Sequence, residues 1–129
     1  MVEPVFLDFQ HIEEIHQASL EAYGGSPGIR DQGLIESALG SAMNTFFYAN
    51  GDLSDIAAAY AFHLAQAQAF LDGNKRTGIG AALLFLRGNG VTKVPSDEQL
   101  YDAMIAIAEK RLDKAGLAEM FRRAAVSLS

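Results

Sequence analysis

Residues 68 to 78, QAFLDGNKRTG, place an acidic side chain, two glycines, an amide and two adjacent cations within a largely apolar stretch. Where a helix begins, the first backbone N–H groups have no intrahelical partner, and with the positive end of the helix dipole they form a cradle for phosphate. Gly73 allows the backbone to approach a ligand closely, and Lys75 or Arg76 can add a charge-assisted contact. The segment therefore indicates an anion site.

Asp72 stands beside this cradle, where its carboxylate alone would repel a phosphate. Magnesium commonly binds through one or two carboxylates together with nucleotide phosphates, so an ion between the two charges removes the conflict. The pattern favours a magnesium nucleotide as the ligand. A Gly-Asn loop followed by Lys-Arg is also an ordinary helix connection with solvated cations, and the spacing alone does not separate the two interpretations.

The loop lies between two predicted helices, at about residues 54 to 70 and 74 to 88. Asp8, Asp31 and Ser96 are predicted to cap three more, and a last helix is expected near the C-terminus. Together they predict an all-α bundle of about six helices. The residues expected to face inward are Ile12, Ile15, Ala22, Leu34, Ile35, Ala38, Leu39, Ile56, Tyr60, Leu64, Leu83, Leu86, Leu100, Met104, Ile107, Leu117, Phe121, Ala124 and Leu128.

Between residues 42 and 53 the helical pattern fails, and Phe46, Phe47 and Tyr48 precede the turn pair Asn50-Gly51. A turn of this type suits a hairpin, so we expect a short β-hairpin flap here. The three aromatic residues could dock a segment of a target protein as an added strand, or they could simply pack in the core.

The composition is that of one globular domain covering residues 1–129, long enough to bury about two thirds of its unfolded surface. The net charge of −6 disfavours broad contact with nucleic acid or anionic membrane. The chain has no cysteine, which excludes disulfides, thiolate catalysis and zinc–thiolate sites. With no long apolar run and no signal peptide, we expect a cytoplasmic protein.

Residues 68 to 78 resemble the signature of the Fic/Doc family, whose Doc branch reads H-x-F-x-D/N-G/A-N-K-R-T. The matching residues are Phe70, Asp72, Gly73, Asn74, Lys75, Arg76 and Thr77. The segments AYGGSPGIRDQGLIESAL, at 22 to 39, and ALLFLRGNG, at 82 to 90, are similar to the family's N-terminal region and to its helix after the loop. The resemblance spans about residues 7 to 95.

This resemblance implies an all-α bundle with a flap, and transfer of part of a nucleotide to a protein hydroxyl. Many Fic branches move AMP, whereas Doc-like toxins move the terminal phosphate of ATP onto a translation elongation factor and are neutralised by a separate Phd-type antitoxin. In that scheme Asp72 holds Mg²⁺, Gly73 and Asn74 shape the phosphate cradle, and Lys75 and Arg76 contact phosphates. Thr77 completes the nucleotide-binding motif.

Two departures from the family pattern bear on the chemistry. Ile79 stands where the AMP-transferring branches have a second arginine, which favours phosphate transfer. The sequence also has no Ser/Thr-x-x-x-Glu-Gly/Asn stretch, the element that some family members use to inhibit themselves. Control by a partner protein is therefore expected.

Gln68 occupies the position of the family's histidine, which takes the proton from the target hydroxyl. An amide can orient a hydroxyl but cannot hold a proton near neutral pH, so a factor on the order of 10² to 10⁴ in rate should be missing. His63 lies five residues earlier, about 140° around a helix, and is expected to point elsewhere as a structural residue. His11 and His16 are expected to face solvent.

These observations leave two functions open. One is a protein phosphotransferase toxin, attenuated by Gln68, which could be a natural variant or an introduced detoxifying change. The other is a non-catalytic pseudoenzyme that binds nucleotide and an antitoxin, whose helix would lie in a groove of the bundle. Arg122 and Arg123, like Glu13 and Glu14, are expected to be solvated.

Overall fold

The computed structural model describes residues 2–127 of the chain. Within this part the chain forms six α-helices and no strand longer than an isolated β-bridge. The helices are α1 (Phe9–Tyr23), α2 (Gln32–Phe47), α3 (Leu53–Ala67), α4 (Asn74–Gly88), α5 (Asp97–Ala108) and α6 (Lys114–Ala125). The prediction of an all-α bundle of about six helices is confirmed. None of these helices is both long and apolar enough to span a bilayer.

The three predicted N-caps are all present. The carboxylates of Asp8 and Asp31 accept the backbone N–H groups of His11 and Leu34 at 3.0 and 3.3 Å, at the starts of α1 and α2. The hydroxyl of Ser96 accepts the N–H of Gln99, whose side chain returns a bond to the backbone of Ser96. Each cap satisfies an N–H group that the helix itself leaves free, which is why these helix starts could be located from sequence.

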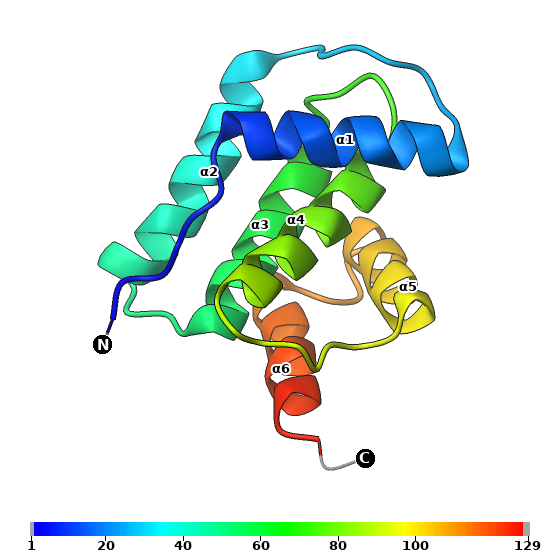
Figure 1. Cartoon of the computed structure of the whole chain (residues 1–129). Helices are drawn as coiled ribbons and strands as arrows, with labels where there is room; N and C mark the ends of the chain where they lie inside the picture. The colour runs from blue at the N-terminus through cyan, green and yellow to red at the C-terminus, as the bar shows by residue number, and fades with distance from the viewer. Residues whose placement is uncertain (1, 128–129) are drawn as a thin grey trace.

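The centre of the fold is the pair α3 and α4, which run in opposite directions (Figure 1). Helix α1 lies across α4, while α2 and α6 pack against α3. Residues 57 to 61 of α3 are all buried, and four of the five are alanines, whose small side chains allow α4 to approach closely. At Gly78 of α4 an added Cβ atom would lie only 2.7 Å from the carbonyl oxygen of Ala61. The motif is thus mounted on two closely packed helices.

Most residues expected to face inward are buried or partly buried. The confirmed set is Ile12, Ile15, Leu34, Ile35, Ala38, Leu39, Ile56, Tyr60, Leu64, Leu83, Leu86, Leu100, Met104, Ile107, Leu117, Phe121 and Ala124. Ala22 is exposed, because it lies in the last turn of α1 next to the exposed residues 23 to 31. Leu128 lies outside the described residues.

The predicted hairpin flap at 42 to 53 is wrong. Helix α2 continues to Phe47, with Tyr48 as its C-cap, and Asn50-Gly51 connects two helices. The hydroxyls of Ser41 and Thr45 bond to carbonyls four residues earlier, so α2 satisfies these polar groups within its own backbone.

The aromatic residues at the end of α2 do not form a strand that a target could extend. Phe46 and Phe47 have their ring centroids 6.1 and 5.8 Å from that of Phe6, in the segment before α1. Phe47 is still 49% exposed and Tyr48 is 86% exposed, whereas Phe46 is partly buried. Two of the three residues proposed for target docking therefore pack against the N-terminal segment.

That N-terminal segment is bound to the core through two side chains. The Asn89 side chain accepts the N–H of Val5 at 2.8 Å and donates to the Val5 carbonyl at 3.0 Å, at the C-terminal end of α4. The Tyr60 hydroxyl accepts the N–H of Leu7 at 2.9 Å, and burial raises the pKa of this tyrosine to about 12. Both anchors join the segment to the α3–α4 pair.

Arg122 was expected to be a solvated cation, but the structure shows that it joins α6 to the start of α3. Its guanidinium bonds to the carboxylates of Asp52, Asp55 and Glu119 at 2.7–3.1 Å. The hydrogen bond from Arg122 holds the pKa of the Asp52 carboxyl below its usual value. Arg123, in contrast, is exposed, and Glu119 is its only bonded partner among residues 2–127. Glu13 and Glu14 are exposed as expected.

The contact between α3 and α4 can be tested at Gly78. The change Gly78→Ala should lower the free energy of unfolding by about 1–3 kcal/mol, because the new methyl group meets backbone rather than a movable side chain. Urea unfolding followed by circular dichroism measures this. Gly40→Ala, inside α2 with no atom within 4 Å of the added carbon, is the matched control and should stabilise by about 0.5–1 kcal/mol. Equal effects at the two sites would contradict the close packing.

The Arg122 cluster predicts a specific pH dependence of stability. Because the folded-state pKa of Asp52 is lowered, the unfolded state binds more protons in acid, and the contribution is lost as the pH falls below 3.8. The loss of stability caused by Arg122→Met should therefore be largest near pH 7 and should shrink by pH 3. Urea unfolding at both pH values measures it, with Arg123→Met as the control. A pH-independent difference would count against the ion cluster.

Candidate functional site

The loop between α3 and α4 begins and ends with residues in the left-handed region. Helix α3 ends at Gln68, whose φ of 50° stops the helix, and Gly73 precedes α4 with a φ of 79°. Glycine adopts this conformation readily, while among other residues asparagine, aspartate and histidine do so most often. Position 68 therefore favours a residue that tolerates the left-handed conformation, and neighbouring segments keep Gln68 in it.

Part of the surroundings is the loop formed by residues 24 to 31, which lies alongside residues 68 to 71. The Arg30 and Asp31 N–H groups both donate to the Ala69 carbonyl, at 2.7 and 3.0 Å, and Leu71 N–H donates to Gly28 at 3.1 Å. The Arg30 guanidinium also donates to the carbonyl of Gln68. These bonds fix the backbone that carries Gln68.

Asp72 is tied to the backbone through both of its carboxylate oxygens. Oδ1 accepts the N–H of Gly73 at 2.8 Å, and Oδ2 accepts the N–H of Ser26 at 3.2 Å. Gly25 makes the second contact possible, because a Cβ atom there would lie 2.9 Å from Oδ2. Each carboxylate oxygen keeps a further lone pair, so Asp72 is fixed in place and still able to bind a cation.

Asn74 shapes the turn with its side chain. Its amide oxygen accepts the N–H of Phe70 at 3.1 Å, and its amide nitrogen donates to the Phe70 carbonyl at 3.0 Å. The side chain is therefore engaged within the protein, and only the backbone N–H of Asn74 is left for a ligand. Asn74 therefore closes the turn with its side chain, and its expected role in shaping a phosphate cradle stays a prediction.

His16 supports the loop from below, so the expectation that it faces solvent is wrong. Its ring is buried and stacks on Phe70 with 3.8 Å between ring centroids, and its Nε2 donates to the carbonyl of Asp72 at 2.8 Å. His11 is nearer to the expectation, because its side chain is partly exposed while its Nδ1 accepts the N–H of Asp8 in the capping box of α1. The error arose because the loop that covers His16 lies more than fifty residues away in sequence.

His63 points away from the motif, as predicted. Its Nε2 lies 3.1 Å from the Lys114 amine, at the start of α6. Burial and the neighbouring ammonium group lower the pKa of His63, so the neutral ring accepts this hydrogen bond. His63 is therefore a structural residue and no substitute for a base at position 68.

A cavity of about 520 Å³ opens over the motif. It is lined by Gln68, Asp72, Gly73, Asn74, Lys75 and Arg76 of the motif, together with Ser19, Tyr23, Gly24, Gly25, Ala65, Leu71 and Tyr101. Gln68 is exposed here, and within residues 2–127 its side-chain amide has no hydrogen-bond partner. The structure thus gathers all the predicted site residues around one cavity except Thr77 and the aromatic group at the end of α2.

The start of α4 leaves three backbone donors free at this cavity. The N–H of Gly73 bonds to Asp72, but those of Asn74, Lys75 and Arg76 have no partner within the described residues. These groups are the unsatisfied donors that a helix N-terminus presents to an anion. An anionic ligand would complete their hydrogen bonding.

Thr77 does not reach the cavity. Its side chain is fully buried, and among the described residues its hydroxyl has no hydrogen-bond partner. Its backbone N–H begins the regular bonding of α4 by donating to Gly73. The structure thus places Thr77 beneath the first turn rather than beside a ligand.

Magnesium is compatible with this site only in one arrangement. Within residues 2–127 no three histidine or acidic side chains gather in a way that could hold a metal ion. An ion at Asp72 would therefore take most of its oxygen ligands from a bound molecule and water, which is common for magnesium with nucleotide phosphates.

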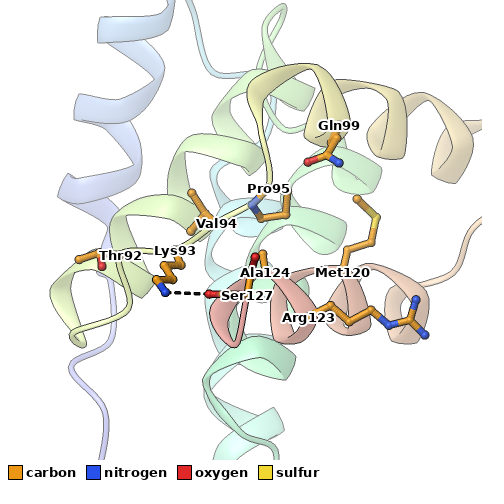
Figure 2. A pocket seen from close by; sticks show the side chains of 9 residues that line it. All are labelled: Thr92, Lys93, Val94, Pro95, Gln99, Met120, Arg123, Ala124 and Ser127. Carbon is orange, nitrogen blue, oxygen red and sulfur yellow. Dashed lines mark hydrogen bonds between the residues drawn. The ribbon is translucent and has the colours of Figure 1, made fainter. Parts of the chain in front are cut away.

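A different cavity, shown in Figure 2, lies between α6 and the segment before α5. Its cations are engaged: Lys93 donates to the Ser127 carbonyl at 2.7 Å, and Arg123 bonds to Glu119. It also has none of the free helix N–H groups found at the motif. We therefore assign the candidate site to the motif cavity.

A family model described as the Fic/DOC family matches residues 6–86. The chain belongs to the Fic/DOC family. It is 36% identical over 110 residues to the protein kinase Doc of Escherichia phage P1, an alignment that covers 84% of this chain and 86% of that protein. It is also 40% identical over 81 residues to the toxin Doc of Mycolicibacterium smegmatis, covering 61% and 62% of the two chains. Both relatives are Doc proteins, which confirms the predicted branch of the family.

The Fic/DOC motif is thus held in place by residues outside it, which the motif sequence alone did not indicate. Sequence reasoning missed His16 and Arg30, which hold the loop, and Tyr23 and Tyr101, which line its cavity. Arg30 contacts the motif through the carbonyls of Gln68 and Ala69, and His16 contacts it through the carbonyl of Asp72 and the ring of Phe70. These are packing and backbone contacts, so the residue types alone gave no sign of them. The resemblance of residues 22 to 39 to the family was the one signal that this region matters.

Proposed function

We propose that this chain is a Doc-like toxin that transfers the terminal phosphate of Mg-ATP to a hydroxyl of a target protein, with a translation elongation factor as the target. The observation that carries the proposal is the set of three unpartnered N–H groups, on Asn74, Lys75 and Arg76, facing a cavity beside Asp72. The similarity to proteins named as a toxin and as a protein kinase supports the class of activity.

The chain's own residues divide the work of binding. The backbone N–H groups of the first turn of α4 bind phosphate oxygens, and Lys75 and Arg76 add positive charge next to them. Asp72 holds the magnesium ion through its remaining lone pairs. Bound Mg-ATP would supply the transferable phosphate. Positioning and electrostatic stabilisation account for most of the catalysis in phosphoryl transfer, so this cradle is the main catalytic device.

Phosphate transfer is favoured over AMP transfer by the residue type at position 79, which is isoleucine. This residue is partly buried and lines the neighbouring apolar cavity, not the motif cavity. Because residue 79 is isoleucine, the chain lacks the cationic side chain that AMP-transferring members place at this position. AMP transfer is the alternative chemistry, and the position of a radioactive label in the nucleotide distinguishes the two.

Gln68 limits the rate of the proposed reaction. Its carboxamide lines the cavity and can orient a target hydroxyl, but it cannot accept the proton that leaves that hydroxyl. We infer that the chain is attenuated or inactive while its phosphate cradle is intact. The alternative function is a pseudoenzyme that binds nucleotide and an antitoxin without turnover, and the free Gln68 side chain is the observation that favours it.

The proposed partner is a Phd-type antitoxin acting in trans, in the cytoplasm where translation occurs. Family membership and the Doc relatives support an antitoxin in general. An amphipathic helix in a groove of the bundle is the binding mode that we propose for it.

Restoring the base tests the chemistry. Gln68→His should raise phosphate transfer from [γ-³²P]ATP to the elongation factor by a factor on the order of 10² to 10⁴ and should arrest growth when expressed. Histidine tolerates the left-handed conformation at this position, so folding should be retained. Gln68→Asn is the matched control, because asparagine tolerates the same backbone but cannot take a proton. A γ-label on the target supports phosphate transfer, whereas an α-label would support AMP transfer.

An inactive and harmless Gln68→His variant that still binds nucleotide would instead favour the pseudoenzyme.

The metal role of Asp72 is tested by calorimetric titration with ATP in magnesium and in EDTA. Magnesium should tighten ATP binding to the unaltered chain, and Asp72→Asn should lose at least about tenfold of that magnesium-dependent affinity. The amide keeps one acceptor for the loop N–H groups, so Asp72→Asn isolates the charge better than alanine. Glu36→Gln on α2, which lines none of the cavities described above, controls for net charge. Equal magnesium dependence in Asp72→Asn would rule out Asp72 as the ligand.

A further inference from the structure

Arg76 is held between aromatic rings from two other helices. The central carbon of its guanidinium lies 3.9 Å from the ring centroid of Tyr23, the last residue of α1, and 5.6 Å from that of Tyr101 on α5. Both distances are within the range of a cation–π interaction. Three separate elements thus converge on one side chain in the first turn of α4.

Arg76 has no other partner among residues 2–127. No carboxylate or carbonyl there bonds to its guanidinium, although Asp97 and Glu98 line the neighbouring cavity. Stacking on a ring occupies the face of the guanidinium and leaves the N–H groups at its edge unused. Arg76 is therefore held in place while its hydrogen-bond donors stay available.

The stacked group lies at the junction of two cavities. The motif cavity, of about 520 Å³, and an apolar cavity of about 580 Å³ share Ser19, Tyr23, Arg76 and Tyr101 in their walls. Tyr23 is 66% exposed and Tyr101 41% exposed, so neither ring is placed there by burial in the core. Their common neighbour is the arginine.

We propose that Tyr23 and Tyr101 are positioning residues that hold the Arg76 guanidinium at the edge of the motif cavity, with its N–H edge free for a phosphate of the bound ligand. The inference rests on the proposed function, because it needs a phosphate ligand in that cavity. A tyrosine at a nucleotide site could also stack on the base. Here the guanidinium already covers a face of the Tyr23 ring, which favours action through Arg76.

The experiment compares Mg-ATP with Mg-tripolyphosphate, which has the phosphates but no base or sugar, by calorimetric titration. Tyr23→Leu should weaken both ligands by the same factor, about two- to fivefold, as expected for one exposed cation–π contact. Tyr23→Phe keeps the ring and should bind both ligands as the unaltered chain does. In an Arg76→Met background, Tyr23→Leu should cause no further loss. Tyr48→Leu, at an exposed tyrosine outside the cavities described above, is the matched control.

Three results would overturn the inference. Tyr23→Leu could weaken the binding of Mg-ATP but not of Mg-tripolyphosphate, it could weaken binding by the same factor in the Arg76→Met background as in the unaltered chain, or it could leave the affinity for both ligands unchanged. The first would assign Tyr23 to the base instead. If Tyr23→Leu does not fold, as judged by circular dichroism, Tyr101→Leu makes the same comparison on a different helix. Failure of the unaltered chain to bind either ligand would instead refute the proposed function, and this inference with it.

Discussion

The free N–H groups at the start of α4 depend on how completely the preceding turn satisfies its own polar groups. Asn74 uses its side chain on the backbone of Phe70, Asp72 takes the N–H of Gly73, and His16 takes the carbonyl of Asp72. Because the turn is closed in this way, it cannot fold back to cap the helix. The three remaining donors are left for a group outside the described residues, and the phosphate site that we propose is a consequence of that closure.

The support for this turn comes from segments distant in sequence. Arg30 binds the carbonyl of Gln68, His16 reaches Asp72 from α1, and Tyr23 meets Arg76. These contacts act on backbone carbonyls or on an aromatic face, so they restrain the backbone and the Arg76 side chain while leaving the carboxylate of Asp72 without a cationic partner in the part of the chain that the structure describes. The cavity is therefore lined by a hydrogen-bonded backbone, and within residues 2–127 the side chains of Lys75 and Arg76 keep their N–H donors unused.

Local rules were enough to predict the helices and the motif. Capping residues such as Asp8, Asp31 and Ser96 act within three residues, and the apolar spacing of α3 depends on one helix alone. The free N–H groups at the start of α4 could also be predicted, because the first N–H groups of any helix have no partner within that helix and Gly73 has no side chain to cap them. Features determined by nearby residues were therefore predictable.

The larger errors concern contacts between distant segments. His16 was expected in solvent but is covered by the motif loop, and Arg122 reaches Asp52 across the fold. The supposed flap failed for a related reason: Phe46 and Phe47 interrupt the amphipathic pattern of α2 because they pack against Phe6, which the spacing within α2 cannot reveal.

Helix α4 is fastened by a carboxamide at each end, Asn74 to Phe70 and Asn89 to Val5, and each of these amides engages both the N–H and the carbonyl of its partner. The N-terminal residues therefore help to hold α4, which carries the motif, although they contact the C-terminal end of this helix and the motif lies at its N-terminal end. A purification tag or fusion joined directly before Val5 would strain this clasp, so it is the wrong place to attach one when the cavity is to be kept native.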